Sequence, residues 1–194
     1  MTATRLEGGD PPGSIGVPVG PNEIRLVDEH DRDVAPGAVG EIVMRGPLLV
    51  KEYWRDAAAT AKAMRGGWFH TGDLARRDEV GHFYFVDRKK DMVRRGGENV
   101  SSQEVEHVLR CHPGIADAAV LGVPDPVWGE EVKAYVVLRE GESETTVPPR
   151  SIVEFCAERL APFKVPHDIE YRADLPRTAS HRVRKELLRK EGQR

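Results

Sequence analysis

The sequence contains little cysteine and few aromatic residues. Only two cysteines occur in 194 residues, Cys111 and Cys156, and neither belongs to a CxxC pair or a Cys/His cluster. This argues against a disulfide framework or a zinc site and favours reduced, buried thiols. Aromatic residues make up 6% of the chain, so we expect a core built mainly from Val, Leu, Ile and Ala.

The chain also lacks strong net charge and long apolar runs. A formal net charge of −3 gives no general reason to expect nucleic acid as a partner. No apolar stretch approaches the length needed to span a membrane, and residues 1–5 lack the apolar segment of a signal peptide. We therefore expect a protein of the reducing cytoplasm with no membrane span.

The first half of the chain has the pattern of short strands between turns. After a Gly- and Pro-rich stretch at residues 8–21, strands are expected at residues 23–27 and 41–45. An Ala-rich segment at residues 56–64 predicts a short helix that ends at the glycine pair 66–67. Together these features predict a small β-rich, barrel-like unit.

A domain boundary is expected near residue 89, where a basic turn lies between two further strand patterns at residues 83–86 and 91–94. The chain would then divide into 1–89, a β-rich piece of a larger domain, and 90–194, a separate domain.

The second part alternates between helical and strand patterns. Ser101 followed by Glu104 forms a capping box before an amphipathic helix. Strands are expected at residues 115–123 and 132–138, another helix that begins near residues 149–151 and extends to Leu160, and a short helix within the basic tail at 185–190. This alternation predicts a compact α/β domain (α+β in overall class) with a mixed sheet and flanking helices.

Two residues suggest a sugar or phosphate ligand. The carboxylate of Asp73 could accept both hydroxyl donors of a ribose, and Gly72 would let the backbone approach the ligand. The guanidinium of Arg88 suits a ribose oxygen, a phosphate or a carboxylate. The alternatives are an ordinary Gly-Asp turn and a solvated charge run, and each motif taken alone favours them.

A glycine pair offers another candidate. Gly96 and Gly97, followed by Glu98 and Asn99, stand between a strand and the capped helix, where backbone could approach an extended ligand. A purely structural glycine pair is the competing interpretation.

Taken in order, these motifs resemble the adenylate-forming superfamily of acyl- and aryl-CoA ligases, luciferases and peptide-synthetase adenylation domains. The resemblance spans roughly residues 13–190, and within the superfamily it is closest to the crotonobetaine/carnitine-CoA ligase branch. The segments that carry it are residues 40–47, 67–73, 87–88, 96–106 and 175–178.

The resemblance implies a two-step reaction in one active site. A carboxylic acid attacks the α-phosphate of ATP to give acyl-AMP and pyrophosphate, and CoA then displaces AMP after the C-terminal domain has rotated about a hinge. Asp73 and Arg88 match the nucleotide-binding residues and would meet at one sugar from opposite sides of the hinge, and Lys90 matches the hinge itself. Gly96, Gly97 and Glu98 match the CoA-binding loop.

The chain departs from the family pattern at its end. A Gly-Lys pair usually follows Pro-Arg-Thr after two residues, and its lysine acts in adenylation, whereas here His181 and Arg182 stand in these positions. Arg182 is the predicted catalytic residue, with a weakened or altered role, and a surface residue is the alternative.

The usual phosphate loop and acyl pocket are absent, and Ala3 stands where a Mg²⁺-associated Glu is expected. The chain itself therefore shows no metal site, although ATP, CoA and Mg²⁺ are the implied cofactors. We expect the C-terminal part of an acid:CoA ligase, shortened or truncated, without its N-terminal adenylation domain and nearly inactive alone.

Other accounts remain. One is a noncatalytic module that binds nucleotide or CoA or docks on another chain, and a weaker one is a nucleic-acid adapter that uses the basic tail. The sequence identifies neither the acid substrate nor the oligomeric state.

Overall fold

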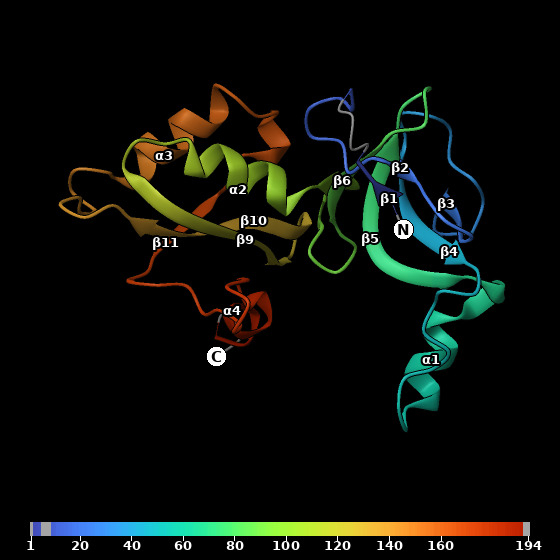
Figure 1. The fold of residues 1–194 in the computed structure, drawn as a ribbon. Helices are drawn as coiled ribbons and strands as arrows, with labels where there is room; N and C mark the ends of the chain where they lie inside the picture. The colour runs from blue at the N-terminus through green and yellow to red at the C-terminus, as the bar shows by residue number, and fades with distance from the viewer. Residues whose placement is uncertain (1, 5–8, 192–194) are drawn as a thin grey trace. The chain divides into compact units, whose positions relative to one another are not determined.

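The computed structural model describes residues 2–4 and 9–191, and they form two compact units (Figure 1). The first unit ends at Lys90 and the second begins at Asp91. This division falls one residue after the boundary expected from the sequence. Each unit is described by itself below. Met1 and the last three residues of the basic tail, 192–194, lie outside the described residues.

The first unit is built on an antiparallel four-stranded sheet. Its strands lie in the order β3-β4-β5-β6. Their bounds are Glu23–Val27, Val39–Arg45, Phe69–Arg77 and Phe83–Arg88, and a two-stranded ribbon pairs β1 (Thr2–Ala3) with β2 (Val17–Pro18). In the described part of the chain β3 and β6 are the edges of an open sheet, so the barrel-like form expected for this unit is wrong.

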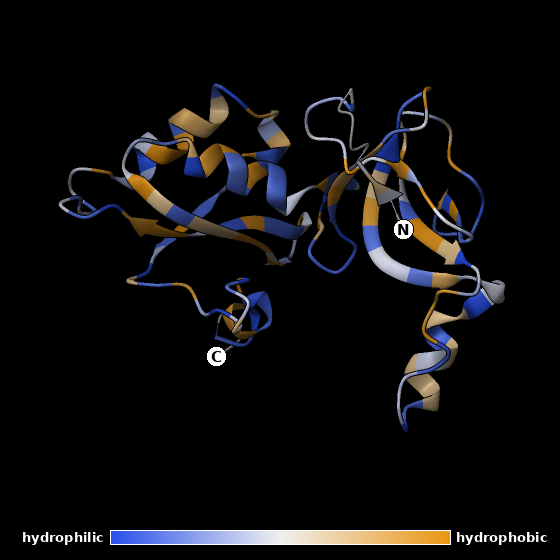
Figure 2. Cartoon of the chain, in the orientation of Figure 1, coloured by the Kyte–Doolittle hydropathy of each residue, from blue (hydrophilic) through white to orange (hydrophobic). Residues whose placement is uncertain are grey.

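A small apolar core supports this sheet. Leu26, Ala75 and Phe83 are buried together, and Ile24 and Ile42 pack against them from the neighbouring strands. Figure 2 shows β4 as largely hydrophobic, as a strand in the middle of a sheet should be.

Helix α1 (Ala57–Ala63) lies where the Ala-rich pattern predicted it. The Asp56 side chain accepts a hydrogen bond from the Ala59 amide, which satisfies a free N–H of the first turn. A 3₁₀ turn, η1 (Arg65–Gly67), follows, with Gly66 at φ +61°. The helix has no buried residue, so its position depends on its ends rather than on a packed face.

A pronounced bulge bends strand β5. Glu41 pairs with Leu74 and Val43 with His70, so one residue of β4 faces three residues of β5, Thr71 to Asp73. Gly72 has φ +73°, a conformation that glycine adopts without steric cost. Figure 1 shows the resulting curve of β5.

The second unit is a mixed sheet with helices on both faces. Its main strands are β9 (Ile115–Asp125), β10 (Gly129–Leu138) and β11 (Asp168–Tyr171), and β10 pairs antiparallel with β9 and parallel with β11. The hairpin of β7 (Val93–Arg95) and β8 (Glu98–Val100) joins this sheet through a pair between Arg95 and Gly129. The mixed α/β class expected from the sequence is confirmed.

Alternation along β9 divides the core of the second unit in two. Val120 packs in the cluster that includes Leu109 of α2 (Ser102–Arg110) and Ile152 of α3 (Pro149–Ala157). Its neighbour Leu121 packs on the opposite face with Leu188 of α4 (Lys185–Glu191). Figure 1 shows α2 and α3 on one side of this sheet and α4 on the other. A short 3₁₀ turn, η2 (Pro162–Lys164), precedes β11.

The second unit confirms the predicted cap of α2 and the predicted burial of one of the two cysteines. Ser101 caps α2 by accepting a hydrogen bond from the Glu104 amide, as the capping box predicted. Cys156 is buried, and burial raises the pKa of its thiol to about 11. Cys111 is exposed at the end of α2, so its expected burial is wrong: the helix carries it past the last residue that faces the core. Among the described residues, no helix is both long and apolar enough to cross a bilayer.

Candidate functional site

A cavity of the first unit lies beside the bulge of β5. It has a volume of about 620 Å³ and is lined by the bulge, by the end of β6 and by helix α1. Asp73, Arg88 and Lys90, three residues singled out from the sequence, all line it. A volume of this size falls within the range of about 300–1,000 Å³ that small-molecule sites occupy.

Asp73 and Arg88 are direct partners on neighbouring strands. They pair across β5 and β6, and Nε of Arg88 lies 3.5 Å from Oδ1 of Asp73. Their side chains are 37% and 45% exposed, so both have room for a further partner. The convergence expected from the sequence is found, but both residues belong to the first unit. The expectation that they approach from opposite sides of the hinge is therefore wrong.

Hydrogen bonds hold the bulge in shape. The Thr71 hydroxyl donates to the Ile42 carbonyl at 2.8 Å, and the Asp73 amide donates to the Thr71 hydroxyl at 3.1 Å. The Lys89 amide donates to the Gly72 carbonyl at 2.8 Å, which ties the end of β6 to the same loop. The loop that carries Asp73 is thus fixed by its neighbours on both sides, as a preformed binding loop requires.

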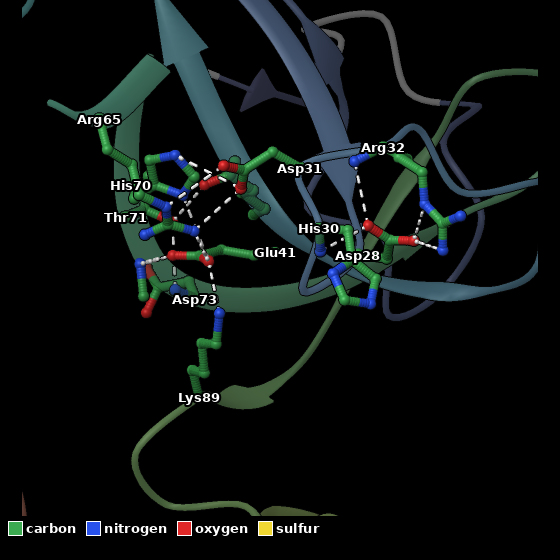
Figure 3. Close-up of polar contacts among 12 residues, drawn as sticks. Asp28, His30, Asp31, Arg32, Glu41, Arg65, His70, Thr71, Asp73 and Lys89 are labelled. Atoms are coloured by element: carbon green, nitrogen blue, oxygen red, sulfur yellow. Dashed lines mark hydrogen bonds and ion pairs between the residues drawn. The ribbon is translucent and has the colours of Figure 1, made fainter. Parts of the chain in front are cut away.

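A buried carboxylate, Glu41, lies beneath the loop (Figure 3). Its side chain is 4% exposed, and it accepts hydrogen bonds from the Gly72 amide at 3.1 Å and from Nζ of Lys89 at 2.9 Å. Burial alone would raise the pKa of Glu41, but the Lys89 hydrogen bond and charge, with smaller contributions from His70 and Gly72, bring it below its usual value. Glu41 is therefore ionised at neutral pH.

The charged cluster continues behind Glu41. Nη2 of Arg65 lies 3.6 Å from Glu41 and 3.0 Å from Asp31. His70, with a side chain only 5% exposed, has Nδ1 3.4 Å from Glu41 and Nε2 3.8 Å from Asp31. The hydrogen bond from Arg65 lowers the pKa of Asp31. Figure 3 shows these side chains directed toward one another around Glu41.

Sequence reasoning missed Glu41 as a site residue. In the sequence, Glu41 stands out only as part of a strand and of the motif at residues 40–47. One signal was available: Glu41 and Val43 are two residues apart and share a face of β4, where Val43 is 1% exposed. A carboxylate that shares a strand face with a buried side chain needs partners, and these come from distant parts of the chain.

Along the chain, the predicted hinge and CoA-binding residues lie close to the point where the first unit ends and the second begins. Lys90 is exposed and is the last residue of the first unit. Gly96 and Gly97, at φ +58° and +86°, form the two-residue turn of the β7–β8 hairpin, in which Glu98 pairs with Arg95. A Cβ added to Gly96 would lie 2.8 Å from Cε3 of Trp128, so this glycine is also needed for close packing.

Arg182 stands at the end of a tight turn. The Thr178 amide donates to the Arg182 carbonyl at 2.8 Å, and the His181 amide donates to the Thr178 carbonyl at 2.9 Å. His181 has φ +61°, a conformation that favours glycine, the residue that the resemblance implies at this position. The Arg182 side chain is exposed.

The described residues contain no group of three or more His, Cys, Asp or Glu side chains arranged to hold a metal ion. The cavity itself offers an aspartate paired with an arginine, a donor and acceptor set that suits hydroxyl and phosphate groups.

Comparison with known proteins agrees with this geometry. The family model of the AMP-binding enzyme matches residues 1–54, and that of the AMP-binding enzyme C-terminal domain matches residues 104–182. The crotonobetaine/carnitine–CoA ligase of Salmonella arizonae is 45% identical over 191 residues, covering 93% of this chain and 36% of the relative.

Two solved structures show the same fold. ATP-bound MatB from Rhodopseudomonas palustris has a TM-score of 0.89 at 34% identity, over 98% of this chain and 38% of its own. The anthranilate–CoA ligase AuaEII in complex with anthranoyl-AMP has a TM-score of 0.84 at 33% identity, over 97% of this chain and 36% of its own.

The fold and these matches define the class of this chain, that of the AMP-binding enzymes. The chain belongs to the AMP-binding enzyme family, in which it corresponds to the C-terminal portion, and it is similar to crotonobetaine/carnitine–CoA ligases. It spans about a third of the length of the relatives it matches.

Proposed function

We propose that the chain is the C-terminal part of an ATP-dependent acid:CoA ligase. The reaction would convert a carboxylate and ATP to acyl-AMP and pyrophosphate and then transfer the acyl group to CoA. The observation that carries this proposal is the pairing of Asp73 with Arg88 at the cavity of a chain that belongs to this family.

Asp73 and Arg88 would bind the nucleotide. The Asp73 carboxylate accepts hydrogen bonds from the ribose hydroxyls, and the Arg88 guanidinium donates to a ribose or phosphate oxygen. Hydrogen bonds to charged groups contribute about 1.5–3 kcal/mol each, so losing one would weaken binding by about one to two orders of magnitude. This role needs little movement within the first unit, because the loop is already fixed.

The remaining residues would act in the separate steps. Arg182 supplies positive charge to the adenylation step from an exposed turn, and Lys90 is the hinge about which the second unit turns. Gly96, Gly97 and Glu98 present a hairpin turn with no side chain at its two tip positions, which would let the pantetheine chain of CoA pass close to backbone.

The fit to a magnesium ion is different. Mg²⁺ usually binds through one or two carboxylates together with substrate phosphates, so the phosphates of ATP would supply much of its coordination. The proposed partners are therefore a small carboxylic acid, ATP, CoA and an N-terminal adenylation domain. The two free thiols are compatible with a cytoplasmic location.

A chimaeric enzyme tests the proposal. In this chimaera, residues 2–191 replace the matching part of the Salmonella arizonae ligase, and pyrophosphate release and acyl-CoA formation are measured with crotonobetaine or carnitine. We expect both activities in the chimaera and little turnover by the chain alone. A folded chimaera without pyrophosphate release would contradict the proposal.

A noncatalytic module remains the second candidate, supported by exposed apolar side chains. Leu48 and Trp54 of the first unit are 71% and 80% exposed. Calorimetric titration of the chain with AMP and with CoA separates the accounts. Binding by the chain together with an inactive chimaera would favour the module.

A further inference from the structure

We propose that Glu41 is a positioning residue, which holds the loop of Asp73 and the end of strand β6 that carries Arg88 as one rigid element. The roles of Asp73 and Arg88 rest on the function proposed above. Glu41 acts on them through Gly72 and Lys89, the residues next to each of them in the chain.

The contacts of Glu41 join segments that are far apart in the sequence. Oε1 accepts from the Gly72 amide, 31 residues away, at 3.1 Å, and Oε2 accepts from Nζ of Lys89, 48 residues away, at 2.9 Å. A carboxylate that is only 4% exposed loses most of its hydration, so these two hydrogen bonds replace water as its partners.

The same two partners are also bonded to each other. Because the Lys89 amide donates to the Gly72 carbonyl at 2.8 Å, the chain forms a closed ring. The ring runs from the Glu41 carboxylate to the amide of Gly72 and on to the carbonyl of the same residue. It continues to the Lys89 amide and returns to Glu41 through the Lys89 side chain. Breaking one link of a ring leaves each segment held from one side only.

The ring lies next to the two nucleotide-binding candidates, and its members Glu41, Gly72 and Lys89 line the same cavity. Asp73 follows Gly72 and Arg88 precedes Lys89, so the ring fixes the backbone on which both side chains stand. Their 3.5 Å separation is therefore set by Glu41 as well as by the pairing of β5 with β6. Figure 3 shows Lys89 and the loop approaching Glu41 from different directions.

Charge is essential to this role. Lys89 is 35% exposed and would extend into solvent without an anionic partner. Arg65 at 3.6 Å and His70 at 3.4 Å further surround the carboxylate, and together with Lys89 they favour its ionised form. An uncharged residue of the same shape would keep the Gly72 contact but hold Lys89 weakly.

Two variants break the ring with little change in volume. Glu41→Gln keeps a carbonyl acceptor for Gly72 and removes the charge, and Lys89→Met keeps the side-chain stem and removes the ammonium. Asp78→Asn is the matched control. Asp78 accepts hydrogen bonds from three amides of a turn in the same unit and does not line the cavity.

Amide hydrogen exchange on the chain itself measures the rigidity of the loop. We expect the Gly72 and Lys89 amides to exchange about tenfold faster or more in Glu41→Gln and in Lys89→Met, because each variant loses a charge-assisted hydrogen bond. The double variant should add little to either single change. The proposal would be overturned if the exchange rates of these two amides rose no more in the ring variants than in Asp78→Asn.

A kinetic test in the chimaera separates positioning from simple support of the fold. Glu41→Gln should raise KM for ATP by about tenfold and change kcat by less than about threefold, since binding contacts are weakened before the chemical step. An unchanged KM despite faster exchange would leave Glu41 a structural residue and overturn the proposal. An inactive parent chimaera would count against the proposed function alone, because the exchange result does not depend on it.

Discussion

Asp73 on β5 lies directly opposite Arg88 on β6, with 3.5 Å between Oδ1 and Nε. The pair is partly exposed and therefore contributes little to stability as an ion pair. Its importance is its location, since both side chains line the cavity beside the bulge of β5. A pair that can be lost without unfolding the unit is well suited to mutational tests of function.

The first prediction concerns Asp73. In the chimaera, Asp73→Ala should raise KM for ATP by about 10- to 100-fold, because a carboxylate that accepts the ribose hydroxyls is lost. Initial rates of pyrophosphate release give the values. The control is Asp33→Ala, which removes an exposed carboxylate that pairs with Arg25 outside the cavity. Equal effects of the two substitutions would contradict a nucleotide-binding role.

The second prediction concerns the altered end of the family motif. Arg182→Ala in the chimaera should depress acyl-AMP formation much more than thioester formation, because positive charge at this position would stabilise the adenylation step. The two half-reactions are measured separately, the second with preformed acyl-AMP. Equal losses in both would count against a specific role. The double substitution of His181→Gly with Arg182→Lys restores the usual family pair and should increase adenylation.

The third prediction concerns the backbone at His181. A φ of +61° is more costly for a β-branched residue than for His, so His181→Val should destabilise the second unit by up to about 1–2 kcal/mol. His181→Gly should be nearly neutral or slightly stabilising, because relief of the strain offsets the greater freedom of glycine in the unfolded chain. Urea unfolding of the chain gives both values. A Val variant as stable as the parent would show that the turn does not constrain this residue.

The fourth prediction separates two reasons for a glycine. Gly96→Ala should destabilise the chain more than Gly97→Ala, although both residues have positive φ. A Cβ at Gly96 would meet Trp128 at 2.8 Å, whereas one at Gly97 would find no atom within 4 Å. Only the conformational cost, about 1–2 kcal/mol, applies to Gly97, and urea unfolding gives the difference between the variants. Adding Trp128→Ala should reduce the extra loss at Gly96.

The fifth prediction is a loss of stability in acid. Burial would raise the pKa of Asp78, but hydrogen bonds from the His82 and Gly81 amides and the Tyr84 hydroxyl lower it to about 2. Since the folded-state pKa lies below the ordinary value of 3.8, Asp78 stabilises the first unit above about pH 4. This contribution is lost as the pH falls toward about 2.

Unfolding midpoints measured from pH 5 to pH 2 test this prediction. Asp78→Asn should lower the midpoint at pH 5 and make its acid dependence shallower. If the unfolding midpoint of the variant fell with pH as steeply as that of the parent chain, other carboxylates would cause the loss of stability in acid.

Much of the secondary structure followed from local signals. The capping residues Asp56 and Ser101 set the starts of α1 and α2. Alternation identified β3, and apolar, β-branched runs identified β9 and β10. These features depend on neighbours within a few residues, which the sequence displays directly. The resemblance to a family likewise rests on motifs that can be read in order along the chain.

The sequence by itself determined the fold class, the capped helices and the family. The tertiary structure decided the open form of the first sheet, the exposure of Cys111 and the location of Asp73 and Arg88 in one unit. It also decided the burial of Glu41. The physical reason is the separation of the interacting residues along the chain. The bulge in β5 and the burial of Glu41 depend on hydrogen bonds between residues 29 to 48 positions apart, and no local sequence pattern shows which distant groups will meet.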